Sequence, residues 1–590
     1  MRGYVQQFVG MAAGGIKRIR VHMGGRLGRI IIIAALLTGS TMCWAAPAPV
    51  VPGGANAGRV LENPTPLPEP TPAAPPVVVT PQIGVPAPPG AEGALILVKK
   101  VIVQGSTVYG NQELTDTFSP YLHEHMTVGK LYEMVAALTR RYHKDGYTLS
   151  RAAVPPQDLS DGTVRIRVIE GYIDVVQTQG AYRSAAAADE IIGRIKSYRP
   201  LNMKKLERDM LLLNDLAGVT VRAVLKAPES TPQHAAPPGA TDLLLVFHDV
   251  PAPASATIDN YGSRYAGPYQ MELQAGANHL VMPYQQTLVS GTTALPQSHE
   301  LQDVQVSHRV TLDGEGTTAT LQAGYAHTEP GYQLAPSEII SDAYNYGLTV
   351  SRPLVRSRTQ NLYLAGDIVI KDITTDSLDS RLYHDKLTIV SVSATCDQAD
   401  PWGGGNLAQL KLSQGLNVLG ATRPGSADLS RADGHSDFTR LAATLSRLQT
   451  ITQEFRLYAA ATGQYSWSPL LSSEQFGYGG QQLGRAYDLA EFTGDEGVAG
   501  TVELRYSLPV LVPNSTSELF SFYDVGRVWN YHDMQSMEGG ASAGVGLRFA
   551  YGGHVSGNLT LAQPLTRKVS APEYGNGYAP RALVSITVKD

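Results

Sequence analysis

Residues 453–467 read QEFRLYAAATGQYSW, and their side chains alternate in character along the whole stretch. The mostly apolar set comprises Phe455, Leu457, Ala459, Ala461, Gly463, Tyr465 and Trp467. Residues 498–508 (VAGTVELRYSL) repeat the pattern, with Glu503 and Arg505 in the polar set. Alternation sustained over about ten residues is typical of a strand that faces lipid on one side and a polar lumen on the other. These stretches predict a transmembrane β-barrel.

The same pattern recurs through residues 251–590, which we assign to an outer-membrane β-barrel of about 16 antiparallel strands. The strands of a soluble sandwich are usually about 5–6 residues long, and these run longer. Moreover, 20 of the 29 Tyr lie here, many near strand ends, where an aromatic girdle is expected. The expected strands begin near Ala256, Tyr269, Leu301, Thr317, Ala343, Gln360, Lys386, Asn406, Phe438, Glu454, Glu474, Val498, Glu518, Ala541, His554 and Ala582.

The composition of the 590 residues excludes several other classes of protein. A net charge of −5 gives no basic field for nucleic acid, so no nucleic-acid partner is expected. Only 2 Cys are present, too few for a disulfide scaffold or a cysteine-based zinc domain. No apolar run reaches the roughly 18–20 residues of a membrane helix, the longest being residues 30–37.

Residues 1–45 have the order of features of a signal peptide. A basic region containing Arg26 and Arg29 precedes the apolar run at residues 30–37, and Ala45 ends a small-x-small cleavage site. A lipoprotein attached through Cys43 is disfavoured because the residues before it make a poor lipobox. Cleavage near Ala45 leaves Cys396 as the remaining cysteine, so no internal disulfide is expected.

Residues 46–92 contain 14 of the 38 prolines and are predicted to be a Pro-rich linker. Proline cannot continue a helix or a central strand, and Pro-rich chain favours extended polyproline II. We therefore expect a solvated, semi-rigid spacer.

Two small α/β modules are predicted between this linker and the barrel, at residues 93–171 and 172–250. Each repeats the order strand, helix, helix, strand, strand. In the first, Leu131, Met134 and Leu138 recur at helical spacing, and Gly146 ends the helix. In the second, Asn202 is a good N-cap residue. An exposed strand edge in such a module could accept an extended peptide, unless neighbouring structure covers it.

The modules contain no catalytic constellation that we can defend. His123 and His125 flank Glu124, but histidines two apart point in different directions on a helix, where metal ligands normally lie four apart. No catalytic, metal or cofactor-binding residue is therefore predicted, and no cofactor is expected.

The connection that precedes residue 498 is rich in glycine and contains Phe476, Gly477, Gly479, Gly480 and Arg485. Glycine permits sharp turns and close backbone approach. A phosphate-binding loop is excluded, because no Gly-Lys-Ser/Thr follows and no strand-to-helix context exists. We place this loop between the eleventh and twelfth expected strands.

From about residue 95 onward the sequence resembles the TpsB transporters of two-partner secretion, which belong to the Omp85 superfamily. The resemblance rests on residues 154–162 (VPPQDLSDG) leading into 169–173 (IEGYI), on 206–215 (LERDMLLLND) and on 259–264 (DNYGSR). It implies that the modules are two POTRA domains, POTRA 1 (93–171) and POTRA 2 (172–250).

The resemblance also implies roles for the glycine-rich loop, whose motif in this family is Val-Arg-Gly-Phe/Tyr. The matching residues here are Leu483, Gly484, Arg485, Ala486 and Tyr487. The loop would fold into the lumen, where Arg485 would pair with Asp524 of a strand that carries Phe522 and Gly526 in a Phe-x-Asp-x-Gly pattern. This sequence has Ala486 where the family has Gly, so the backbone there could differ.

Two further departures from the family concern the ends of the chain. An N-terminal helix often plugs the lumen in the family, whereas within residues 46–92 only residues 53–63 could form one, and it would be short. Barrels of the outer membrane usually end in an aromatic residue, whereas this chain ends in Val588, Lys589 and Asp590.

The resemblance implies an outer-membrane pore, with POTRA domains in the periplasm, that translocates an unfolded exoprotein to the cell surface and is not an enzyme. The expected partners are a secreted TpsA-like exoprotein, outer-membrane lipid and, during biogenesis, the barrel-assembly machinery. The alternatives are an Omp85-type insertase for other barrels, of which the best-known type has five POTRA domains, and a passive porin, which needs none.

Overall fold

The computed structural model describes residues 51–61, 67, 69–70, 88–228, 237–510, 512–570, 572 and 575–590. The predicted signal peptide at residues 1–45 lies outside them. Among the helices of these ranges, none is long and apolar enough to cross a membrane.

The first module contains two helices and two small sheets. Its elements are β1 (Leu95–Val98), β2 (Lys100–Gln104), α3 (Asn111–Phe118), β3 (Glu124–Thr127), α4 (Val128–Lys144), β4 (Arg151–Ala153) and β5 (Thr163–Ile169). The strands β2, β5 and β4 form one sheet in that order, and β1 pairs with β3. The predicted helical face is confirmed, since Leu131, Met134 and Leu138 of α4 are buried in the module's core. His125 lies on strand β3 rather than on a helix.

The motif at residues 169–173 has a structural explanation in this module. Glu170 accepts hydrogen bonds from the backbone N–H groups of Thr107 and Val108 and from the hydroxyl of Tyr142. Burial raises the pKa of Tyr142, so its hydroxyl stays protonated and can donate. Glu170 therefore fastens the loop after β2 to helix α4.

The second module repeats this arrangement with one three-stranded sheet. Its elements are β6 (Tyr172–Gly180), α5 (Ala186–Ser197), α6 (Met203–Asn214), β7 (Val219–Lys226) and β8 (Ala240–Asp249). The sheet order is β6, β8, β7. As predicted, the side chain of Asn202 caps α6 by accepting from the backbone N–H of Lys204 at 2.9 Å. Ile191, Leu206 and Leu243 are buried between the helices and the sheet.

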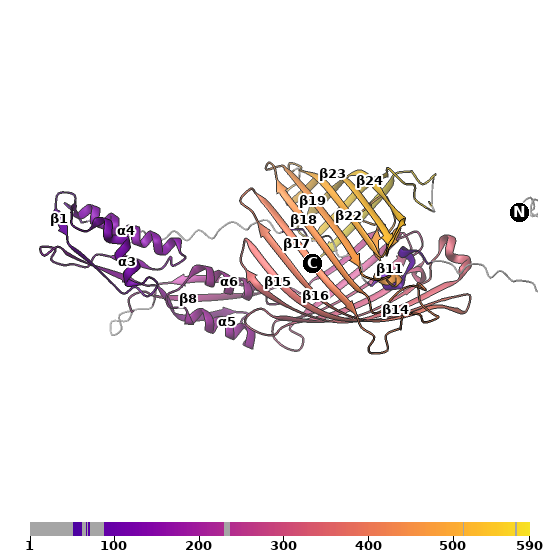
Figure 1. Cartoon of the computed structure of the whole chain (residues 1–590), viewed down its shortest axis with the longest axis horizontal. Coiled ribbons are helices and arrows are strands. Elements are labelled where there is room, and N and C mark those ends of the chain that lie inside the picture. Colours follow the sequence, from indigo (N-terminus) through magenta and orange to yellow (C-terminus); the bar gives the residue numbers. More distant parts are fainter. Residues whose placement is uncertain are drawn as a thin grey trace, which may run out of the picture. The chain divides into compact units, whose positions relative to one another are not determined.

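Sixteen strands within the described residues form a closed antiparallel barrel (Figure 1). They are β9 (Ala254–Asp259), β10 (Tyr269–Asn278), β11 (Gln285–Leu295), β12 (Gln302–Thr311), β13 (Thr318–Thr328), β14 (Ile339–Arg356), β15 (Gln360–Ser377), β16 (Ser380–Ala399), β17 (Gly404–Gly415), β18 (Thr439–Thr450), β19 (Phe455–Ser466), β22 (Glu496–Ser507), β23 (Ser515–Asn530), β24 (Asp533–Tyr551), β25 (Val555–Pro564) and β26 (Arg581–Lys589). Closure satisfies the backbone groups that an open sheet edge would expose to lipid.

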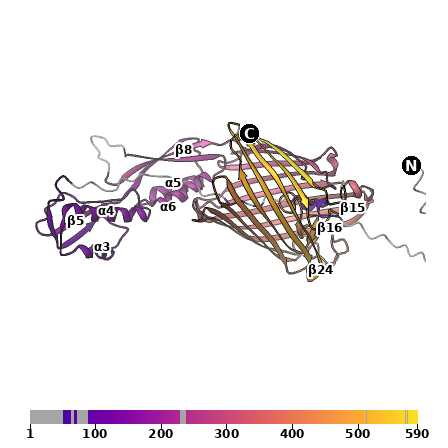
Figure 2. The same cartoon turned by 90° about the horizontal axis from the view of Figure 1, so that it is seen from above.

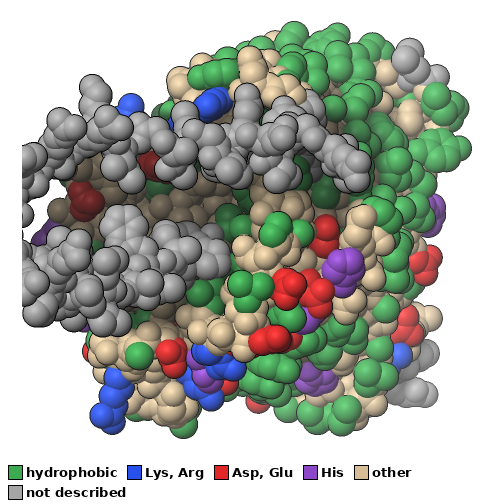
Figure 3. All heavy atoms as spheres, turned by 90° about the vertical axis from the view of Figure 1, so that its right-hand side faces the viewer, with side chains coloured by type: hydrophobic (Ala, Val, Ile, Leu, Met, Phe, Trp, Pro, Cys, Tyr) green, Lys and Arg blue, Asp and Glu red, His purple; other side chains and the backbone are tan. Residues whose placement is uncertain are grey.

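The alternation that predicted the barrel separates its two faces. Tyr465 of β19 and Trp467 just beyond it are 47% and 48% exposed, whereas Tyr458 of the opposite parity is buried. Figure 3 views one end of the molecule, where Asp and Glu side chains gather near the middle and hydrophobic side chains cover the upper and right-hand margins. The apolar set therefore faces outward, as lipid requires.

The expected strand count is correct, but one true strand was missed and one expected strand is not part of the barrel. The prediction missed β11, whose Ser, Thr and Gly residues give only weak alternation between polar and apolar side chains. It also placed a strand near Glu474, where the structure has a short 3-10 helix and a small hairpin instead. Because the missed strand and the extra strand offset each other, the glycine-rich loop connects the eleventh and twelfth barrel strands, β19 and β22, as expected.

The barrel closes through its shortest strand. β9 has six residues and pairs with β26 from Asp259 opposite Ser585 to Ser255 opposite Lys589. Beyond it, the side chain of Asn260 continues the pairing, because its amide donates to the carbonyl of Ala582 and accepts from the N–H of Val584. The chain then leaves the wall and turns into the lumen.

Candidate functional site

The loop between β19 and β22 folds back into the barrel. A small hairpin, β20 (Phe476–Tyr478) paired with β21 (Phe492–Gly494), forms its base. Gly479, Gly480 and Gly484 have φ of +120°, +114° and +75°, which an L side chain adopts only with strain. The glycines therefore allow the sharp turns that bring the tip of the loop against the wall.

Arg485 at the loop tip is surrounded by acceptors from the wall. Its Nε lies 3.0 Å from Oδ2 of Asp524 and its Nη2 lies 2.7 Å from Oδ1, a bidentate pair. Its Nη1 lies 2.6 Å from Oε1 of Glu503, and its Nη2 donates to Thr501 as well. The guanidinium also lies 3.7 Å from the centroid of the Phe522 ring. Arg485 and Asp524 are 4% and 0% exposed, so this is a buried charge cluster.

The neighbours of Arg485 in the predicted motif surround the same site. The backbone N–H of Gly484 donates to Asp524 at 3.2 Å, and Leu483 packs against the cluster of Tyr478 and Tyr487. The Tyr487 hydroxyl donates to a backbone carbonyl of the wall, that of Ala541, at 3.2 Å.

Gly526 of the matching strand supplies space instead of a contact. A Cβ at this position would collide with the ring of Tyr478. The Phe-x-Asp-x-Gly pattern of β23 thus has a physical reason at each named position: a ring over the guanidinium, a carboxylate for it, and room for the loop.

The departure of Ala486 from the family motif is accommodated. The loop residues with positive φ are Gly479, Gly480, Gly484 and Ala490, so Ala486 has no conformation that requires glycine. Its methyl group is buried against Phe520, Phe522 and Ala562.

The sequence did not reveal the ion pairs that extend the Arg485 cluster. Glu503 also binds Arg505 and Arg548, at 2.8 and 3.0 Å. Arg548 in turn binds Glu518, which contacts Arg456. The alternation along residues 498–508 does predict that Glu503 and Arg505 point inward, but the pairing depends on the register of four different strands.

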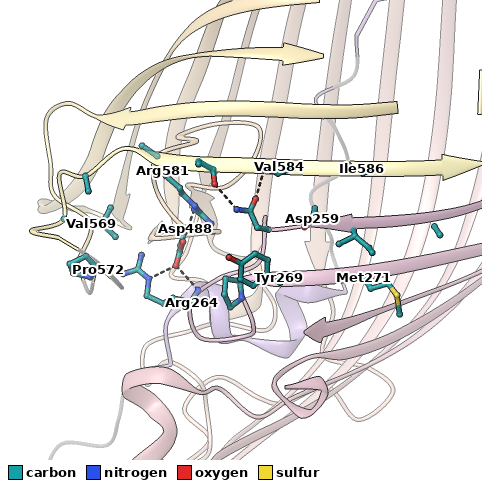
Figure 4. A pocket seen from close by; sticks show the side chains of 18 of the residues that line it. Asp259, Arg264, Tyr269, Met271, Asp488, Val569, Pro572, Arg581, Val584 and Ile586 are labelled. Atoms are coloured by element: carbon teal, nitrogen blue, oxygen red, sulfur yellow. Dashed lines mark hydrogen bonds and ion pairs between the residues drawn. The ribbon is translucent and has the colours of Figure 1, made fainter. Parts of the chain in front are cut away.

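A second ion cluster fastens the other side of the loop, at the seam of the barrel. Asp488 lies between Arg264 and Arg581, with distances of 2.6 and 2.9 Å (Figure 4). Arg264 binds Glu491 as well, at 2.8 Å. These residues border a cavity of about 800 Å³ that strands β9, β10 and β26 also line. Arg264 belongs to the DNYGSR motif, which thus connects the first strand to the loop.

A third cluster lies where the loop begins. Glu474 is fully buried and binds Lys371 at 2.7 Å and Arg440 at 3.0 Å. Three ion clusters therefore fasten the loop to the wall, in addition to the apolar packing of its tyrosines and of Ala486.

The N-terminal segment also enters the lumen, which corrects part of the predicted solvated linker. Residues 51–61 form a 3-10 turn, η1 (Gly53–Ala55), and a short helix, α2 (Ala57–Val60), visible in indigo inside the barrel in Figure 2. Ala57 and Leu61 are buried against β13–β16. Proline content predicted an extended, solvated spacer, whereas residues 51–61 form a 3-10 turn and a short helix that the barrel wall encloses.

Polar contacts hold this segment, which we call the plug. Asn56 caps α2 and donates to the hydroxyl of Tyr383 at 3.2 Å. Arg59 donates to the carbonyls of Ser472 and Gln475 in the loop. The plug and the loop therefore support each other.

Comparisons with known proteins agree with this architecture. The family model for the haemolysin secretion/activation protein ShlB/FhaC/HecB matches residues 240–549, and that for the ShlB-type POTRA domain matches residues 96–171. The outer membrane transporter CdiB of Escherichia coli is 25% identical over 510 residues, 83% of this chain and 82% of that protein. The heme/hemopexin transporter protein HuxB of Haemophilus influenzae (strain 86-028NP) is 24% identical over 484 residues, 78% of this chain and 81% of that protein.

Among solved structures, CdiB from Escherichia coli matches with a TM-score of 0.70 and 21% identity, over 88% of this chain and 94% of that one. That likeness shows a shared fold. The ShlB/FhaC/HecB model covers more than half of the chain, and the barrel and the POTRA domain agree with the two family models. The chain therefore belongs to the haemolysin secretion/activation protein family ShlB/FhaC/HecB, the TpsB outer-membrane transporters of two-partner secretion.

Proposed function

We propose that this chain receives a TpsA-like exoprotein in the periplasm, passes it unfolded through the barrel lumen and releases it at the cell surface. The observation that carries this proposal is the way in which the lumen is filled. A barrel of sixteen strands is wide enough for an aqueous channel. Here a loop and a plug occupy it, and charged and polar contacts together with small apolar clusters hold both of them.

The POTRA domains are proposed to make the first contact with the exoprotein. In the described part of POTRA 2, the sheet order β6, β8, β7 leaves β6 and β7 at the edges. An extended peptide can add to such an edge through backbone hydrogen bonds, which requires no particular sequence. This suits a cargo that arrives unfolded.

The loop motif is proposed to control passage through the lumen. When Arg485 is bound to Asp524 and Glu503, the loop tip is held against the wall. Release of this pair would widen the lumen. Because the chain has no nucleotide-binding motif, we propose that folding of the exoprotein outside the cell makes the movement directional.

We further propose that outer-membrane lipid and the barrel-assembly machinery are the remaining partners, and that the chain is a conduit and not an enzyme. The outward residues of the barrel are apolar, as lipid contact requires. In the parts of the chain that the structure covers, no group of three His, Cys, Asp or Glu side chains is placed to hold a metal ion.

Co-expression with the cognate exoprotein tests the proposal. Deletion of residues 93–250 should abolish its appearance in the medium, and Arg485→Ala should reduce it at least tenfold, since it removes the arginine that pairs with the buried Asp524. The exchange Arg485→Asp with Asp524→Arg should restore part of the secretion. Wild-type secretion by the deletion or by Arg485→Ala would contradict the proposal, and loss of other barrel proteins from the membrane would favour an insertase.

A further inference from the structure

A short piece of the Pro-rich segment lies against the lumen wall, separate from the plug. The carboxylate of Glu69 forms a bidentate pair with Arg505 of β22, with Oε1 2.7 Å from Nη2 and Oε2 3.0 Å from Nη1. Two residues earlier, the backbone N–H of Leu67 donates to the side chain of Gln482 in the loop, at 2.7 Å. Leu67 packs against the wall cluster that Leu448, Tyr458 and Ala460 form. This segment is thus bound at several points, and it is not a solvated tether there.

The guanidinium of Arg505 is held in an orientation that suits binding of a carboxylate. Its side chain is only 6% exposed, while that of Glu69 is 48% exposed. The arginine is therefore a fixed part of the wall, and Glu69 is the group that binds to it from the lumen. The guanidinium lies 4.5 Å from the centroid of the Tyr458 ring, and its Nε donates to Glu503 at 2.9 Å. The ring and Glu503 fix the direction in which the remaining donors point, which favours bidentate binding.

The charges of the wall cluster balance only when Glu69 is present. Ion pairs connect four arginines of the loop and wall, Arg456, Arg485, Arg505 and Arg548. The same pairs connect three wall carboxylates, those of Glu503, Glu518 and Asp524. Four positive charges against three negative ones leave one positive charge, and Glu69 supplies the fourth negative charge. An excess positive charge in a largely buried cluster costs free energy, so a further carboxylate at Arg505 stabilises the wall.

The sequence around Glu69 is of the kind expected in an extended chain. In the sequence, Glu69 lies between Pro68 and Pro70, and such a stretch favours an extended conformation. An unfolded exoprotein that threads the lumen is extended as well, and it offers Asp and Glu side chains along its length.

We propose that Arg505, with Tyr458 and Leu448 beside it, is a binding site in the lumen for a carboxylate on an extended polypeptide. Glu69 of the same chain occupies the site at rest, and acidic residues of the passing exoprotein replace it. This inference rests on the proposed function, since it names a step on the path of the exoprotein.

Conductance of the purified full-length protein in a planar bilayer tests the site without any exoprotein. Glu69→Gln should raise the mean conductance several-fold. A synthetic peptide of residues 64–72 (PTPLPEPTP) should then lower it again, whereas the same peptide with Gln in place of Glu should not. Arg505→Gln should open the channel in the same way and respond to neither peptide. Mobility on gels before and after heating checks that each barrel is folded.

Secretion separates a resting contact from a site for the exoprotein. Glu69→Gln should secrete at the wild-type rate or faster, because the site is free. Arg505→Gln should secrete several-fold more slowly although its channel is more open, and Arg505→Lys should recover part of the rate. Equal secretion by Glu69→Gln and Arg505→Gln would overturn the role toward the exoprotein, and unchanged conductance of Glu69→Gln would overturn the site at rest. Loss of secretion in every variant, with the peptide responses intact, would count against the proposed function instead.

Discussion

Ala486 illustrates how a single residue can differ from a family motif without disturbing a site. The motif has glycine at this position, yet the structure demands positive φ at Gly484 and not at Ala486. The methyl group instead fills space beside Phe520 and Phe522. The residues that the motif does require are those with a charge to neutralise or a ring to accommodate, such as Arg485 and Gly526.

Replacement of Ala486 by glycine should therefore weaken the loop slightly and leave its chemistry intact. The loss of a buried methyl group and the greater freedom of glycine in the unfolded chain together cost about 1–2 kcal/mol. We expect a lower midpoint of heat unfolding on gels and unchanged secretion. Gly484→Ala is the matched control, because its Cβ would meet the ring of Tyr478 under positive φ, and it should reduce secretion. A loss of secretion in Ala486→Gly would show that the methyl group has a role beyond packing.

At the scale of single elements, the short strand β9 is notable because a side chain, that of Asn260, continues its pairing with β26. Its six residues pair with β26 only up to Asp259, and Asn260 then substitutes a side-chain amide for two backbone groups. This device lets the chain leave the wall early, so that Ser263 can donate to the plug at Gly54 and Arg264 can reach Asp488 in the loop. The short strand is thus the condition for the contacts in the lumen.

Asn260→Ala should weaken the hydrogen bonding of β26 at its N-terminal end, near residues 582–584. Two hydrogen bonds are lost, each worth about 1 kcal/mol, and the released backbone groups at Ala582 and Val584 face a cavity. Hydrogen–deuterium exchange of the full-length protein should show faster exchange at residues 582–584, while β19 keeps its protection as the internal control. Unchanged exchange at residues 582–584 would mean that the backbone alone holds the seam.

At the scale of the whole molecule, the sequence predicts the features that depend on the periodicity of side chains. It does not predict the contacts that depend on the register between strands. Alternation located the barrel, and helical spacing located α4. The resemblance led to the Arg485–Asp524 pair. Neither the sequence pattern nor the resemblance could locate the partners of Arg505. Glu69 lies more than 400 residues away, and the alignment of the strands decides which inward-facing charges meet. Strand β11 escaped prediction because Ser, Thr and Gly suit both lipid-facing and lumen-facing positions.

Deletion of residues 51–61 should open the lumen without unfolding the barrel. The plug contributes to no barrel strand, and hydrogen bonds and one small apolar cluster connect it to the wall and loop. We expect a higher conductance in planar bilayers and greater sensitivity of cells to large antibiotics, with normal barrel mobility on gels. Wild-type conductance of the deletion variant would show that the loop alone closes the lumen.

The composition of the plug has a consequence for how reversible closure is. Its residues 53–58 are Gly, Gly, Ala, Asn, Ala and Gly, and its helix has four residues. A helix this short does not persist in water, so the plug folds only while the barrel surrounds it. Ordering on binding lowers affinity for a given area of contact. Withdrawal of the segment exposes only the small apolar cluster around Ala57 and Leu61, so little apolar surface is left to bind the passing chain and the segment can return after each round.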